Sequence, residues 1–159
     1  MIVFINMPTK PSEFMTQARM LLMMPKEVNY RSAISRAYYC LFHEVRENID
    51  KTTKYKQILI DTLKEDYKDR GKLTDEINQK IENYDIAHIS PRPRFHWIYK
   101  KALLKIDIDL GNAFGDFEDK RNEADYDLNK TIKQDETKGL IEIMRVETQK
   151  IKYRLEHPK

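Results

Sequence analysis

The chain has 159 residues, of which 40% are hydrophobic and 35% are charged, and this length and composition predict one compact domain. Only 4 glycines and 6 prolines are present, far fewer than the turns of a β-sandwich or barrel would need, so we expect an all-helical bundle. The net charge of +3 is too small by itself to indicate polyanion binding. No apolar run is long enough to cross a membrane, no signal peptide is evident, and the single cysteine fits a reducing compartment. We therefore expect a cytoplasmic protein without a membrane partner.

Apolar residues recur every three or four positions in the first third of the chain, a spacing that is typical of amphipathic helices. Ser12 is expected to cap a helix over roughly 12–24, which Pro25 ends. Asn29 is expected to cap a second helix, whose apolar stripe from Ala33 to Val45 is the strongest in the chain.

The middle of the chain predicts two more helices. A third helix ends at Gly71, and Thr74 can cap a fourth. His88 continues the apolar register of this fourth helix, which predicts a packed core histidine rather than a metal ligand.

Proline and aspartate divide the rest of the chain. After Pro93 a short helix begins at Phe95, and either Asp107 or Asp109 starts the next one. Asp135 is expected to cap a long final helix.

The signatures of common enzyme classes are missing, because the sequence has no glycine-rich phosphate loop, HExxH, paired CxxC or GxSxG. Asp107 and Asp109 form a D-x-D pattern, but the further oxygen ligands and the glycine of a calcium loop are absent. We therefore predict no metal site and no cofactor.

Arg121 stands where an apolar residue would be expected. Steps of four, three, four and three place it on one helical stripe with Leu110, Phe114, Phe117 and Ala124. Burying a guanidinium is costly unless it meets an anion, which could come from the protein, a second subunit or a ligand. Glu118 and Asp125 stand at helical offsets that could supply it, so an internally paired arginine is the alternative to a binding residue.

A polar stripe runs along the second helix beside its apolar one. Arginine recognises phosphate oxygens and histidine titrates near neutrality, so the stripe could bind a phosphate and transfer a proton, although a solvated helix face would have the same pattern. Its members are Arg36, Tyr39, His43, Arg46 and Asp50.

The segment Arg92–Lys105 carries five basic residues and no acidic one, whereas Ile106–Asp127 has a net charge of −6. Basic groups attract phosphates and aromatic rings can stack on unpaired bases, so RNA contact is one interpretation and a short solvated turn is the other. The candidate contacts are Arg92, Arg94, Trp97, Lys100 and Lys101, and Trp97 is expected to be the exposed aromatic residue.

Two stretches of the chain resemble the HEPN superfamily; they are YRSAISRAYYCLFHEVRE (30–47) and KRNEADYD (120–127). The similarity is greatest to small single-domain members, which have an S-R-A-Y-Y segment and a later R-x-x-A-D-Y segment. The resemblance covers about residues 12–156. It implies an up-and-down helical bundle that dimerises, with the motif arginine of each subunit facing a shared cleft.

Catalytic members of this superfamily are metal-independent ribonucleases, often toxins or antiphage effectors, with an arginine followed four to six residues later by a histidine. Arg121 and Asn122 match the first half, but no histidine follows until His157. Because this histidine is missing, the sequence does not decide whether the protein cleaves RNA. The arrangement with a comparable spacing is Arg36 and His43, which lie on the second helix.

Together the residues and the resemblance predict a homodimeric RNA- or nucleotide-binding module of a toxin-antitoxin or phage-defence system. Arg121 would clamp a phosphate, Asn122 would orient it, Tyr126 would contact a neighbouring oxygen, and His43 would transfer a proton if cleavage occurs. One alternative is a non-catalytic dimer whose cleft is filled by a cognate antitoxin or nucleotidyltransferase-like protein. Another is a purely structural dimer with Arg121 held in ion pairs.

Overall fold

The computed structural model describes residues 10–158, which contain α-helices, one short 3-10 helix and no strand. The prediction of an all-helical chain is confirmed. None of the helices in this range combines the length and apolarity needed to cross a bilayer. The elements are α1 (Pro11–Leu22), α2 (Glu27–Lys51), α3 (Thr53–Asp69), α4 (Asp75–Glu82), η1 (Ile86–His88), α5 (Phe95–Ile106), α6 (Ile108–Tyr126) and α7 (Gln134–Glu156).

The chain divides into two compact units. The first runs up to Glu44 and resumes at Asp116, so it contains α1, most of α2, the end of α6, and α7. The second is Val45–Gly115, with the end of α2, then α3, α4, η1, α5 and the start of α6.

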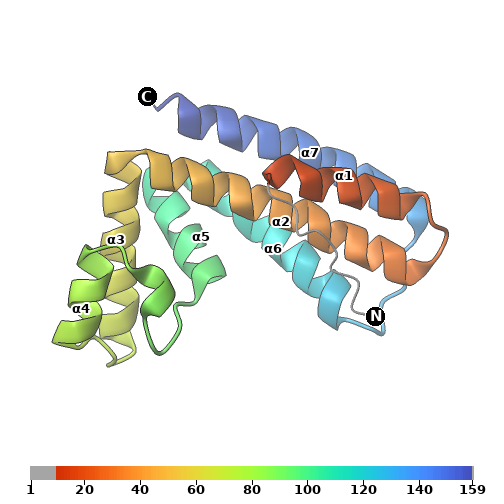
Figure 1. Cartoon of the computed structure of the whole chain (residues 1–159). Helices are drawn as coiled ribbons and strands as arrows, with labels where there is room; N and C mark the ends of the chain where they lie inside the picture. The colour runs from red at the N-terminus through yellow and green to blue at the C-terminus, as the bar shows by residue number, and fades with distance from the viewer. Residues whose placement is uncertain (1–9, 159) are drawn as a thin grey trace, which may run out of the picture. The chain divides into compact units, whose positions relative to one another are not determined.

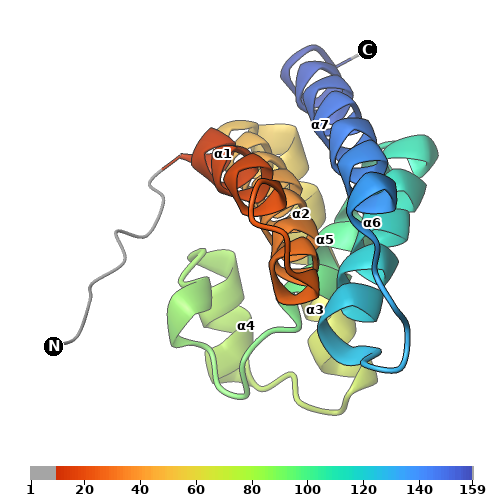
Figure 2. The same ribbon diagram turned by 90° about the vertical axis from the view of Figure 1, so that its right-hand side faces the viewer.

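The four helical segments of the first unit lie side by side, and α1 packs against α7 (Figures 1 and 2). The apolar stripe predicted for α2 forms the middle of this core, because its members Ala33, Ala37, Tyr38 and Leu41 are fully buried. Small alanines on that stripe allow neighbouring helices to approach closely. Ala18 of α1 and Ile141, Met144 and Ile151 of α7 are buried as well.

Arg31 ties the beginning of α2 to the chain that leaves α6. Its Nη1 donates to the carbonyl oxygens of Ala124 (2.9 Å) and Asp127 (3.0 Å). Its Nη2 donates to the carbonyl oxygen of Lys130 and to the Glu27 carboxylate (2.8 Å). One guanidinium therefore bonds the Ala124 carbonyl group in the last turn of α6 and two carbonyl groups of the loop that follows it.

In the second unit, α3 packs against both α4 and α5. Asp66 of α3 is fully buried and is paired with Arg70 (Nη2 to Oδ2, 2.7 Å) and with Arg94. The neighbouring Tyr67 donates its hydroxyl hydrogen to the Pro91 carbonyl. These contacts fix the segment before α5 onto α3.

Three of the predicted caps are wrong. Ser12 lies inside α1, which begins at Pro11 because proline is tolerated in the first turn, where its missing N–H needs no partner. Asn29 lies inside α2, and Asp135 lies inside α7. Thr74 does cap α4, with its Oγ1 accepting a hydrogen bond from the Ile77 N–H at 3.2 Å.

The core position predicted for His88 is also wrong. Tyr84 adopts the left-handed conformation (φ 58°), so the helical register ends at Glu82, and His88 lies in η1 instead. Its side chain is 77% exposed, and its Nδ1 lies 2.5 Å from Asp85 Oδ1.

Candidate functional site

Arg121 projects from α6 into the first unit, and its side chain is only 15% exposed. The residues predicted to share its stripe, Leu110, Phe114, Phe117 and Ala124, are all buried. The prediction that a guanidinium stands in place of an apolar side chain is therefore confirmed.

The guanidinium of Arg121 meets three neighbours. Nε lies 2.8 Å from Asp125 Oδ2, Nη1 donates to Asn122 Oδ1 (3.0 Å), and Nη2 donates to the Tyr39 hydroxyl (3.3 Å). The Nε hydrogen is not aligned with the carboxylate, so this contact is an ion pair rather than a hydrogen bond. Of the two carboxylates that the helical offsets suggested, Asp125 is the one that pairs with Arg121.

The electrostatic surroundings keep Arg121 charged. Burial lowers its pKa, but the neighbouring Tyr39 and Asp125 raise it by more, so the pKa lies above the usual value for arginine. A permanent positive charge with restricted access to water is suited to holding a phosphate group.

The two sequence segments that carry the family resemblance touch each other. Ser35 donates its hydroxyl hydrogen to Asp125 Oδ1 (2.5 Å), and Tyr39 accepts from Arg121, so α2 and α6 are joined at two points. Asp125 is thereby shared between Ser35 and Arg121. The S-R-A-Y-Y and R-x-x-A-D-Y segments form one site.

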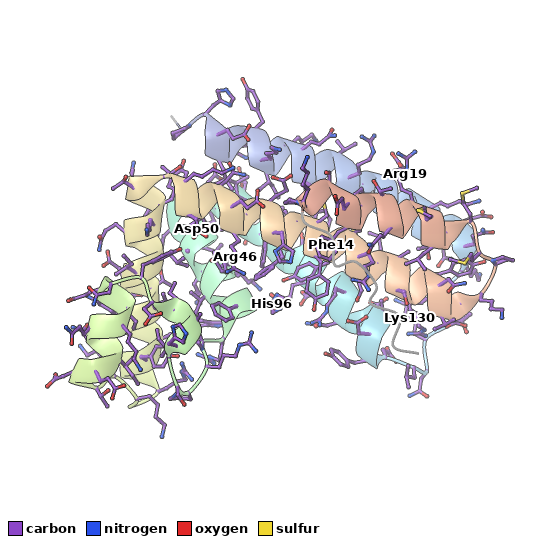
Figure 3. The ribbon with its side chains drawn as sticks, in the orientation of Figure 1. Phe14, Arg19, Arg46, Asp50, His96 and Lys130 are labelled. Carbon is purple, nitrogen blue, oxygen red and sulfur yellow. The ribbon has the colours of Figure 1, made fainter. Side chains whose placement is uncertain are left out.

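Aromatic rings extend this site towards α1. Phe14 stacks on His43, with centroids 5.0 Å apart and planes inclined by 15°, and lies 6.2 Å from the Tyr39 ring. The Arg36 guanidinium lies 6.0 Å from the Phe14 centroid. We call Phe14, Arg36, Tyr39, His43 and Arg121 the Arg121 cluster. Figure 3 labels Phe14, which marks the α1 side of it.

Tyr126 lies at the outer edge of the Arg121 cluster. Its ring centroid is 5.5 Å from the Arg121 guanidinium, and the residue is 70% exposed. A charged group beside an exposed ring matches what an unpaired nucleotide offers, namely a phosphate and a flat base.

The sequence pattern assigned no role at this site to Phe14, which simply counted as an apolar position of the first helix. Its contact with His43 and Tyr39 depends on how α1 lies against α2, which helical spacing within one segment does not reveal. Cys40 is excluded as a nucleophile, because burial and the nearby Glu44 raise its pKa to about 12.

The basic residues around Trp97 belong to the second unit. Arg94 is ion-paired with buried Asp66, and its guanidinium also lies 4.5 Å from the Trp97 ring. Lys101 Nζ lies 5.3 Å from the same ring, which is half-buried rather than freely exposed. The indole face is thus already occupied by cations of this chain.

Arg92 and Lys100, the other two basic candidates, lie in different surroundings. Arg92 is exposed, and its guanidinium lies 5.6 Å from the Phe95 ring. Lys100 is half-buried, and its side chain passes so close to Gly115 that a Cβ there would lie 2.7 Å from Lys100 Cε. Of the four basic residues, Arg94 contacts a buried carboxylate and Lys100 packs against a helix backbone. Within the described residues, Arg92 and Lys101 make neither kind of contact.

The D-x-D pattern is a helix cap. Asp107 Oδ1 accepts hydrogen bonds from the backbone N–H groups of Asp109 (3.0 Å) and Leu110 (3.4 Å) at the start of α6. Within residues 10–158, no group of three or more His, Cys, Asp or Glu side chains could hold a metal ion.

Comparison of the chain with models of known families, with curated proteins and with solved structures gave no match.

Proposed function

We propose that this protein is an HEPN-like RNA-binding module of a toxin-antitoxin or phage-defence system and that the Arg121 cluster holds the RNA. The observation that carries the proposal is the contact between the two motif segments, through Ser35 with Asp125 and Tyr39 with Arg121. Two segments that resemble one family and lie 90 residues apart meet at a charged, partly buried side chain.

The chemistry of the cluster fits a phosphodiester with an unpaired base. Arg36 and Arg121 supply two positive charges around the Phe14 and Tyr39 rings, while Asp125 offsets one of them. A phosphate would replace Asp125 as the partner of Arg121, and Ser35 would keep the displaced carboxylate hydrogen-bonded. The exposed ring of Tyr126 would carry the base.

Replacing Arg121 with alanine is expected to weaken binding of a labelled single-stranded RNA about tenfold or more, because one charge-assisted hydrogen-bonding partner is lost. Fluorescence anisotropy at fixed salt measures the affinity. Arg121→Lys retains the positive charge but loses the planar, forked guanidinium group. Its RNA affinity should therefore lie between those of the wild type and Arg121→Ala.

The matched control is Arg19→Ala, which removes an exposed arginine of the same unit whose nearest carboxylate, Glu142, is 4.0 Å away. It should bind RNA like the wild type. Unaltered affinity in folded Arg121→Ala would contradict the assignment of this site.

The basic segment of the second unit is expected to contribute further phosphate contacts. In the double variant Arg92→Ala, Lys101→Ala, the plot of log K against log salt concentration should flatten by about 1.4, which is about 0.7 for each contact with a single strand. Arg94 is avoided because its loss would leave Asp66 with one partner fewer. A double variant with the wild-type affinity and slope would place the RNA elsewhere.

The family resemblance also leads us to propose a homodimer. Sedimentation at tens of micromolar should give twice the chain mass of 19.1 kDa. A large apolar side chain that a second copy could cover is Leu128, which lies just after α6 and is 77% exposed. A monomer at that concentration would remove the shared cleft that the resemblance implies.

A protein-binding role is the second candidate, and a groove between α1 and α7 favours it. The groove has a volume of about 700 Å³ and includes the exposed Met20 (61%) and Met23 (83%). Exposed methionines adapt to varied partners. A cognate antitoxin or nucleotidyltransferase-like protein bound there would form a complex insensitive to salt, whereas RNA binding weakens as salt rises.

A further inference from the structure

The second unit contains a cavity of about 500 Å³, and Arg92 is the one residue of its lining that the RNA proposal uses. Arg46 and Asp50 line it from the end of α2, Tyr84 from the end of α4, and Phe95 and Tyr99 from α5. Figure 3 labels Arg46 and Asp50, which lie close together at this end of α2. The volume is typical of sites that enclose a small molecule.

Two guanidinium groups, those of Arg46 and Arg92, line this cavity. Within the described residues neither of them forms an ion pair, whereas Arg31, Arg94 and Arg121 each have a carboxylate partner. Since Asp50 is the single acidic side chain lining the cavity, its charged lining has a net charge of +1. The cavity therefore favours an anion.

Another part of the lining is a set of hydroxyl groups that are hydrogen-bonded within the chain. Tyr84 donates to Asp50 Oδ1, and the hydroxyls of Tyr84 and Tyr99 are hydrogen-bonded to each other. Burial raises the pKa of both tyrosines, so both are neutral at physiological pH. The Tyr84 ring is held from outside by Lys56, whose Nζ lies 4.1 Å from the ring centroid. This part of the lining can accept and donate hydrogen bonds to ligand hydroxyl groups.

The rest of the lining is apolar. The Phe95 ring lies beneath the Arg92 guanidinium at 5.6 Å, and Ile86 and Ile89 lie on the segment that joins α4 to α5. A flat ring could pack against these side chains. The lining of the cavity thus supplies two guanidinium groups, hydroxyl groups and apolar side chains on which a ring could pack.

We propose that this cavity binds a small phosphate monoester that carries a ring. The dianionic phosphate lies between Arg46 and Arg92, which together match its charge, whereas a carboxylate would need only one of them. The ring packs on Phe95, and Asp50 with Tyr84 takes the polar groups between ring and phosphate. The site is separate from the Arg121 cluster and does not depend on RNA binding.

Isothermal titration of the full-length protein with AMP and with phenyl phosphate tests the proposal. At least one of the two esters should bind saturably, with one molecule per chain. Removing the phosphate, by using adenosine in place of AMP, should abolish binding or weaken it about tenfold or more, and inorganic phosphate should bind more weakly than the ester.

The Arg46→Gln variant should lose about tenfold or more in ester affinity. Its RNA affinity and salt slope should not change, because Arg46 is outside the RNA proposal, so the two proposals can fail independently. Arg92→Gln is the second variant, in case the first does not fold. Because Arg92 also belongs to the RNA proposal, this variant is judged by its ester affinity, and a fall in its RNA affinity bears on the RNA proposal alone. Arg19→Gln is the control. The proposal would be overturned if neither ester bound, or if adenosine bound as tightly as AMP. It would also be overturned if inorganic phosphate bound as tightly as the esters, or if the folded Arg46 and Arg92 variants kept full ester affinity.

Discussion

In a preparation that cleaves a labelled RNA in the presence of EDTA, His43→Ala is expected to lower turnover at least about a hundredfold, the scale of losing one general acid or base. Attack by a 2′-hydroxyl needs a group that accepts and returns a proton near neutral pH, and imidazole is the side chain best suited to this. Turnover should also fall in Arg121→Ala, because the charge that would stabilise the phosphate is lost.

The reason for choosing His43 is its place in the Arg121 cluster. The histidine that the family motif would place after Arg121 is missing, but the α2 histidine reaches the same pair of rings, Phe14 and Tyr39, that Arg121 and Arg36 flank. Tyr126 also lies beside Arg121, but a phenol is a weak base at neutral pH.

Two further variants separate chemistry from packing. His43→Phe keeps a ring against Phe14, where the imidazole now stacks at 5.0 Å, and removes the proton-transfer group, so it should be as inactive as His43→Ala. His88→Ala removes an exposed histidine of the second unit and should leave turnover unchanged. Robust turnover in folded His43→Phe would place the chemistry elsewhere, and a wild-type protein without turnover would favour a module that only binds.

Local patterns in the sequence predicted the helices and two candidate partners of Arg121. Periodicity located the α-helices of residues 10–158, and the helical offsets named Glu118 and Asp125 as carboxylates that could reach Arg121, of which Asp125 does. Both inferences need only the geometry of a single helix, in which residues three or four positions apart lie on one face.

Contacts between distant segments were beyond such patterns. Tyr39 and Arg121 are 82 residues apart, and Asp66 and Arg94 are 28 apart, so neither pair follows from a helical offset. The family resemblance singled out the two motif segments but did not predict that they touch within one chain. Arg94 shows how such a pattern can mislead. A basic residue close to an aromatic one suggests nucleic-acid binding from composition alone, but the Arg94 guanidinium is paired with a buried carboxylate of this chain.

His88 and the wrong caps have a related cause. A hydrophobic register predicts a longer α4 as long as the backbone stays helical, but the left-handed Tyr84 ends it and turns His88 outward. The caps at Ser12, Asn29 and Asp135 failed because each of these residues already lies within its helix. Propensity identifies a helix more reliably than it identifies its first residue.

Arg31 was assigned no role in the sequence analysis, yet we expect Arg31→Ala to lower the free energy of unfolding by about 3 kcal/mol. The Arg31 side chain is only 13% exposed and donates to three backbone carbonyl groups as well as to Glu27. Its removal would leave the carbonyl oxygens of Ala124 and Lys130 without this partner and would remove one of the two donors to Asp127, and such losses are costly when the groups are shielded from water.

Urea denaturation measures the loss, and for a chain of this size it corresponds to a fall in Tm of about 6–12 °C. Arg31→Lys keeps the charge but cannot reach several carbonyls from one planar group, so it should recover only part of the loss. The free energy of unfolding of Arg19→Ala, on the exposed side of α1, should stay within about 0.5 kcal/mol of the wild-type value.

Because Arg31 holds the end of the helix that carries Arg121 and Asn122, RNA binding by Arg31→Ala should weaken even under conditions where the variant is folded. Wild-type stability in Arg31→Ala would show instead that water replaces the guanidinium at these carbonyl groups without loss.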